Sequence, residues 1–145
     1  MGNFRLNWVA ILVAAIVSFL FEALWYSVFL NEWVAGIGRT DEWLHNSGVS
    51  PPVQYAVAIL CSIVVAAVLT ICIQASGEQT AIRGVIVAGV IWLGFIATFV
   101  ATEYIFEVRS VQLYAINTGY ALIDYMIIGA IVGAWKKKSS HALVA

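Results

Sequence analysis

The chain has 145 residues, of which 63% are hydrophobic and only 10% are charged, so it has too little polar surface to cover a water-soluble globule. Its net charge of −1 gives no indication of a nucleic-acid partner, and we expect none. The length suits a single domain, 1–145, and the apolar excess predicts helical spans of about 20 residues in a lipid bilayer.

The first predicted span covers about residues 8–30, with Trp8 and Trp33 as interfacial anchors. Glu22 lies deep inside it and, together with the span's length, disfavours a cleaved signal peptide. Five residues recur at every fourth position and therefore share one helix face: Ala10, Ala14, Ser18, Glu22 and Tyr26. Because small side chains let helices approach closely, we predict that this face packs against protein.

The longest polar stretch, 31–51, is predicted as an outer loop because glycines and prolines interrupt it. Within it, Thr40 is a suitable N-cap, which predicts a short helix in the membrane interface that ends at Gly48. Glu42 and His45 have the spacing of two metal ligands on one helix face. The Glu-x-x-His spacing occurs here once and on a loop, which favours a solvated surface. We therefore expect no metal site.

Three further spans are predicted at about residues 53–73, 84–102 and 112–135. The connection between the second and the third is short, so these two spans should form an antiparallel hairpin. Gly129 and Gly133 form a GxxxG motif near the end of the fourth span, which permits a close helix contact. The sequence therefore predicts an all-α bundle of four transmembrane helices.

The basic residues predict the orientation of this bundle. With four crossings, both termini and the connection between the second and third spans share one side. That side collects Arg5, Arg83 and the lysines 136–138, whereas the opposite side has Arg39 and Arg109. By the positive-inside rule, both termini are expected in the cytoplasm.

Two acids lie inside the predicted spans, Glu22 in the first and Asp124 in the fourth. The helical rise places Glu22 roughly 12 Å, and Asp124 roughly 15–18 Å, below the same outer surface, so they can meet if these spans are neighbours. No Lys or Arg lies in the core of any span. The pair therefore has no basic partner, and a shared proton or a bound cation is expected.

The neighbours of these acids allow two interpretations. Four polar side chains could complete a proton or ligand site: Ser18, Tyr26, Asn117 and Tyr120. Trp25 could wall an aromatic pocket beside Glu22 for a cation or a flat ligand. Alternatively, the acids form hydrogen bonds between helices and only hold the bundle together.

These alternatives lead to two function classes. The leading hypothesis is a small transport or ligand-binding membrane protein that forms a homo-oligomer or joins a larger membrane complex, because one four-helix chain encloses little interior. The other is a non-catalytic subunit or assembly factor whose acids connect helices. A membrane-embedded enzyme is the third and least favoured class, because the acids have no nucleophile or metal-binding cluster around them. The sequence has no P-loop, Gly-x-Ser-x-Gly or Cys-x-x-Cys motif, so we predict no catalytic residue or cofactor.

Two segments resemble one known family. The pattern Asn7-Trp8-x-Ala10, followed by Ala23-Leu24-Trp25-Tyr26-Ser27, and the closing segment 129–135 are similar to the domain-of-unknown-function family 1761. The resemblance implies a bacterial inner-membrane protein of similar length with four spans and no assigned activity. The sequence departs from the family pattern at Glu22, where glycine is usual, and at Val28, where proline often follows the serine.

Overall fold

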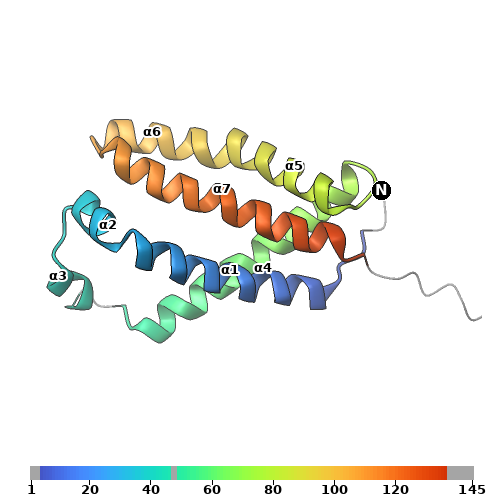
Figure 1. Ribbon diagram of the computed structural model, residues 1–145, viewed down its shortest axis with the longest axis horizontal. Helices are drawn as coiled ribbons and strands as arrows, with labels where there is room; N and C mark the ends of the chain where they lie inside the picture. The colour runs from blue at the N-terminus through green and yellow to red at the C-terminus, as the bar shows by residue number, and fades with distance from the viewer. Residues whose placement is uncertain (1–3, 47–48, 137–145) are drawn as a thin grey trace, which may run out of the picture.

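A computed structural model describes residues 4–46 and 49–136, and these residues form helices and connecting turns with no strand (Figure 1). In chain order the elements are α1 (Trp8–Val28), α2 (Leu30–Ile37), α3 (Asp41–Asn46), α4 (Pro51–Ala75), α5 (Ala81–Ile91), the π-helical segment η1 (Trp92–Ala97), α6 (Thr98–Phe106) and α7 (Val111–Ala134). Four helical stretches are long and apolar enough to cross a membrane, and α5, η1 and α6 together make one of them, 26 residues long. The predicted all-α architecture with four such helices is confirmed.

Side-chain caps fix where several helices begin. The Asn7 side chain accepts a hydrogen bond from the Ala10 amide, and the Thr80 and Ser110 hydroxyls do the same at the starts of α5 and α7. Pro51, the first residue of α4, follows Ser50 and needs no N–H partner at that position. The four long helices begin and end within about one turn of the predicted spans.

The stretch predicted as a loop contains a helix that its sequence did not predict. Residues 30–37 form α2, which ends at Gly38 in a left-handed conformation. Gly36 lies inside the helix, where its missing side chain lets α2 pack against Leu113 at the start of α7. The prediction was wrong here because both glycines were interpreted as helix breakers, whereas one is a packing contact and the other a C-cap.

The predicted short helix in this loop is present as α3. The Thr40 hydroxyl accepts a hydrogen bond from the Trp43 amide at 3.1 Å, as an N-cap should. The helix ends at Asn46, and its predicted end at Gly48 lies outside the described residues.

Helix α7 is central to the bundle. It packs against α1, α4 and α5, and its first half also contacts α2 and α6. Figure 1 shows the start of α1, the turn between α4 and α5, and the end of α7 at one end of the molecule, which we call the terminal end. α2, α3 and the α6–α7 connection lie at the other end, which we call the loop end.

The closest helix contact joins α5 to α7. A Cβ atom on Gly84 would lie 1.9 Å from the Gly129 carbonyl oxygen, and one on Gly133 would lie 2.4 Å from the Thr80 carbonyl oxygen. The two backbones therefore touch without side chains between them. The structure places both GxxxG glycines of the sequence at this contact.

The terminal end is tightly packed, whereas the loop end opens. The main cluster of buried apolar side chains comes from the terminal halves of the helices, whereas Ala97, Leu113 and Ile116 are buried nearer the loop end. Its members are Ile11, Ala14, Ala66, Leu69, Ile73, Ala88, Ile128 and Val132. Gln74 closes this end by two hydrogen bonds with the Arg5 backbone, and Gln79 donates to the Val132 carbonyl at 2.6 Å. By contrast, residues 51–57 of α4 are all exposed, and α1 has no fully buried residue after Ser18.

The glycine contact predicts a stability difference between two substitutions. Gly84→Ala should lower the melting temperature in detergent, because its methyl group meets a backbone carbonyl that cannot move aside; overpacking of this kind costs about 1–3 kcal/mol. Gly94→Ala is the control, since no atom lies within 4 Å of its added Cβ. Equal melting temperatures for the two variants would contradict this account of the α5–α7 contact.

Candidate functional site

Two carboxyl groups from different helices line one pocket. Glu22 lies one turn after the buried Ser18 on α1, and Asp124 lies on the neighbouring α7. The pocket has a volume of about 270 Å³, and Ser62 of α4 and Tyr120 of α7 also line it. We call it the acid pocket.

Asp124 is the unusual residue of this pocket. It exposes only 4% of its surface, and its Oδ1 atom receives no hydrogen bond. Within 4–46 and 49–136 it is the one buried side-chain oxygen or nitrogen without a partner. Leaving a buried polar atom unpaired costs roughly 1–3 kcal/mol, and more for a charged group, so the bare protein bears a penalty at this position.

Ser18 lies beside Asp124 but does not satisfy Oδ1. The Ser18 and Ser62 hydroxyl oxygens are 3.1 Å apart, and the Ser62 hydroxyl donates to the Ala58 carbonyl at 3.0 Å. A hydroxyl has one proton. The single Ser18 proton lies within reach of both Ser62 and the Asp124 carboxyl group, and neither serine donates to Oδ1.

Glu22 lies at the more open edge of the acid pocket. It is half-buried, and the Tyr120 phenol lies beside its carboxyl group. The Tyr120 ring stacks on Phe21 with centroids 5.9 Å apart and lies 5.3 Å from the Tyr26 ring. Aromatic packing therefore holds this phenol between the two helices that carry the acids.

A second pocket of about 280 Å³ adjoins the first, and we call it the side pocket. Glu22 and Ala58 line both pockets. The remaining lining comes from α1 and from the exposed first turns of α4: Phe19, Ala23, Tyr26, Gln54 and Tyr55. The Glu22 carboxyl group thus lies where the two spaces meet.

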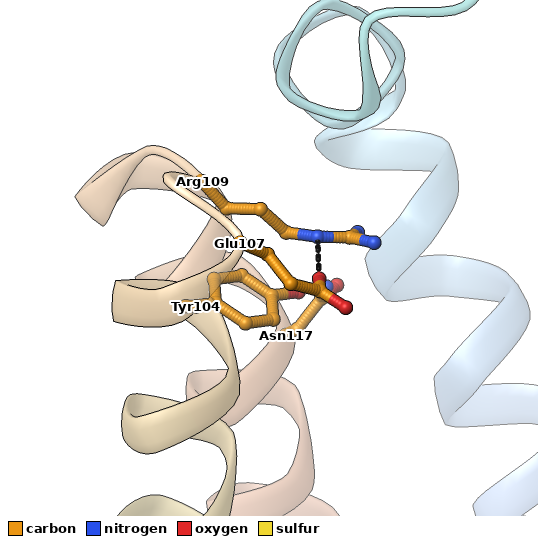
Figure 2. A network of polar contacts seen from close by, with 4 residues as sticks. All are labelled: Tyr104, Glu107, Arg109 and Asn117. Atoms are coloured by element: carbon orange, nitrogen blue, oxygen red, sulfur yellow. Dashed lines mark hydrogen bonds and ion pairs between the residues drawn. The ribbon is translucent and has the colours of Figure 1, made fainter.

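Tyr26 and Asn117 belong to a polar network that leads to the loop end. The Tyr26 hydroxyl donates to Asn117 Oδ1 at 3.1 Å, and Asn117 Nδ2 donates to the Tyr104 hydroxyl at 2.6 Å. Figure 2 shows Asn117 and Tyr104 side by side, with Arg109 paired to Glu107 above them. The Arg109 guanidinium carbon also lies 5.4 Å from the centre of the Tyr104 ring.

The structure gathers some of the predicted site residues and separates others. Glu22, Tyr120 and Asp124 line the acid pocket, and Tyr26 lines the side pocket. Asn117 lines neither; it joins α1 to α6 through its two hydrogen bonds. Ala10, Ala14 and Ser18 are buried on the predicted face of α1.

Trp25 faces a different part of the bundle. Its indole N–H donates to the Ile116 carbonyl at 3.1 Å, and its ring lies 4.8 Å from that of Phe29. These contacts occupy the ring away from both carboxyl groups, and Trp25 lines neither pocket around Glu22.

Sequence reasoning about the site missed residues of α4 and α6. Ala58 and Ser62 lie one turn apart on a small-residue face of α4, and this spacing was the available signal for their position. Tyr55 and Tyr104 carry no such signal, because tyrosines near span ends are ordinary interfacial residues.

One comparison with known proteins gives a match. The model of the family described as "Protein of unknown function (DUF1761)" matches residues 9–133. No curated protein and no solved structure matches the chain. The family match covers all four membrane-spanning stretches except their outermost residues.

The polar network predicts coupling between two side chains. Asn117→Ala should lower stability by about 1 kcal/mol, because it removes two interhelical hydrogen bonds that average about 0.6 kcal/mol each in membrane bundles. Tyr104→Phe removes one of the same bonds, so the double variant should lose less than the sum of the single losses. Thr98→Val is the control, since the exposed Thr98 hydroxyl bonds only to its own helix. Strictly additive losses in detergent unfolding would show that the network does not couple α7 to α6.

Proposed function

The chain belongs to the DUF1761 family, and from the geometry of its acid pocket we propose that it binds a proton or a monovalent cation between Glu22 and Asp124 as part of a transport cycle. The observation that carries this proposal is the unpaired Oδ1 of Asp124, a buried acceptor in a pocket that contains a second carboxyl group. A bound cation or proton would supply the missing partner.

The charge around the pocket supports this proposal. The helices that line it, 8–28, 51–75 and 111–134, contain no Lys or Arg. A charged side chain at such depth costs at least about 2.5–3.5 kcal/mol unless it is neutralised or paired. Because these helices provide no basic partner, the two carboxylates need a bound proton or cation to neutralise them.

The shape of the bundle supports transport rather than permanent storage. The packed core closes the site toward the terminal end, whereas the loop end opens around Glu22. A transporter must expose its site to one side at a time, and a bundle closed at one end and open at the other suits one state of such a cycle. The network from Tyr26 to Arg109 lies on the open side and would respond to movement of α1 against α6.

We also propose that the open side faces away from the cytoplasm, because Arg5, Arg83 and Lys136 lie at the terminal end. In a background without Cys61 and Cys72, a membrane-impermeant maleimide should label Arg39→Cys in intact cells. The same reagent should label Ser76→Cys only after the membrane is opened. The reverse pattern would overturn this orientation and leave the binding proposal intact.

A second candidate function has a specific observation in its favour. Gly94, Thr98 and Thr102 are exposed and lie on one face of η1 and α6, whose main contacts among the described helices are with α7, α5 and each other. Small residues on an exposed membrane face suit close packing against another helix. This favours a non-catalytic subunit or assembly factor, or a homo-oligomer, in which the acids serve as interhelical contacts.

A flux measurement separates these functions. In proteoliposomes that contain the purified protein, an imposed pH or Na⁺ gradient should dissipate faster than in empty vesicles. Glu22→Gln and Asp124→Asn should both reduce this flux to the level of empty vesicles, because each removes one carboxylate from the acid pocket.

Glu103→Gln is the matched control, since Glu103 is exposed and lines neither pocket. Unchanged flux in both pocket variants, with the wild-type elution profile retained, would exclude the transport proposal and favour the subunit function.

A further inference from the structure

We infer that the ligand of this site is an organic ammonium ion with an attached apolar group, and that it reaches Glu22 and Asp124 sideways, between α1 and the first turns of α4. This inference rests on the proposed cation site and specifies its ligand. In it, the ammonium group occupies the acid pocket while the apolar group occupies the side pocket.

The two pockets adjoin each other. They share Glu22 and Ala58, and each has a volume of nearly the same size, about 270 and 280 Å³. Such volumes lie just below the range of ordinary small-molecule sites. A small charged head group in one pocket and a ring or short chain in the other would fill both.

The first turns of α4 leave the side pocket open toward lipid. From Ser62 onward, α4 places a residue in the core about once per turn, whereas residues 51–57 are all exposed. Figure 1 shows α4 crossing α1 obliquely, with its first turns away from α7. A molecule dissolved in the membrane can therefore approach Glu22 between α1 and α4 without passing through the packed core.

The lining of the side pocket suits carbon better than water. Phe19 and Tyr55 meet edge to face across α1 and α4, with ring centroids 5.6 Å apart, and Ala23 and Ala58 contribute only methyl groups. A small inorganic cation needs several oxygen ligands in place of its water shell. An alkylammonium ion instead keeps its charge near the carboxyl groups and gains from aromatic faces and apolar burial.

The charge of the site also restricts the ligand. A zwitterionic lipid carries a phosphate next to its ammonium group, and that phosphate would lie beside the Glu22 carboxyl group. Like charges at this depth are strongly unfavourable. The site therefore favours a molecule with a net positive charge over a phosphocholine head group.

The test compares cations that differ in one part. We expect benzyltrimethylammonium to bind the purified wild-type protein about tenfold or more tightly than tetramethylammonium, because only the former can bury a ring in the side pocket. Binding is measured by isothermal titration in maltoside micelles, with Asp124→Asn as the blank for partition into detergent. Dodecylphosphocholine at a matched concentration should not displace the ring-bearing cation.

A variant of the pocket lining tests entry between α1 and the first turns of α4. Ala58 lines both pockets, so Ala58→Leu should narrow the boundary between them and bring the affinity for benzyltrimethylammonium down to that for tetramethylammonium. Ala56→Leu is the control, because Ala56 is exposed on the same helix and lines neither pocket.

The outcomes separate this inference from the cation site itself. Equal affinities of wild-type protein for the two ammonium ions, or displacement by dodecylphosphocholine, would overturn the inference and leave a site for a simple cation. If neither ion binds but a proton or Na⁺ flux still depends on both acids, the inference is likewise overturned and the simple cation site is retained. If the flux also fails to depend on them, the proposed function fails too.

Discussion

The direct backbone contact between α5 and α7 determines how the rest of the bundle is arranged. Gly84 and Gly129 let these helices touch without side chains between them, and α7 thereby comes close enough to contact α1 and α4 on its other faces. Asp124 lies on α7 between these partners, which is why its carboxyl group is nearly inaccessible although it is charged in water.

The helices pack more tightly at the terminal end than at the loop end, and the acid pocket lies between these two regions. Toward the terminal end, aliphatic side chains and the hydrogen bonds of Gln74 and Gln79 pack the helices together. Toward the loop end, α4 diverges, and the space it leaves is lined by aromatic rings and by Glu22. One helix pair therefore both excludes solvent from Asp124 and gives access to Glu22.

Much of this arrangement follows from local sequence signals. Hydropathy predicts the four spans, the Thr40 cap predicts the start of α3, and the helical rise predicts that Glu22 and Asp124 lie at similar depth. The glycine-rich stretch that forms α2 could not be predicted, because a glycine inside a helix and one that ends it look alike without the partner Leu113.

The residues that line the pockets could not be predicted from the sequence either. The positions of Tyr55, Tyr104 and Trp25 depend on crossing angles between helices that are distant in the chain, and such angles leave no periodic pattern. Ser62 is intermediate, because its small-residue face indicates helix packing but not which side chain it meets.

The central claim is that Asp124 serves a ligand and not the fold, and the melting temperature of Asp124→Ala tests it most directly. Ser18→Ala provides the comparison, since Ser18 is buried nearby and bonded to Ser62. Without ligand, Asp124→Ala should melt at or above the wild-type temperature, because it removes an unpaired buried acceptor, whereas Ser18→Ala should melt below it. A loss in Asp124→Ala as large as that in Ser18→Ala, or larger, would show that the carboxyl group holds the helices together and would contradict the account.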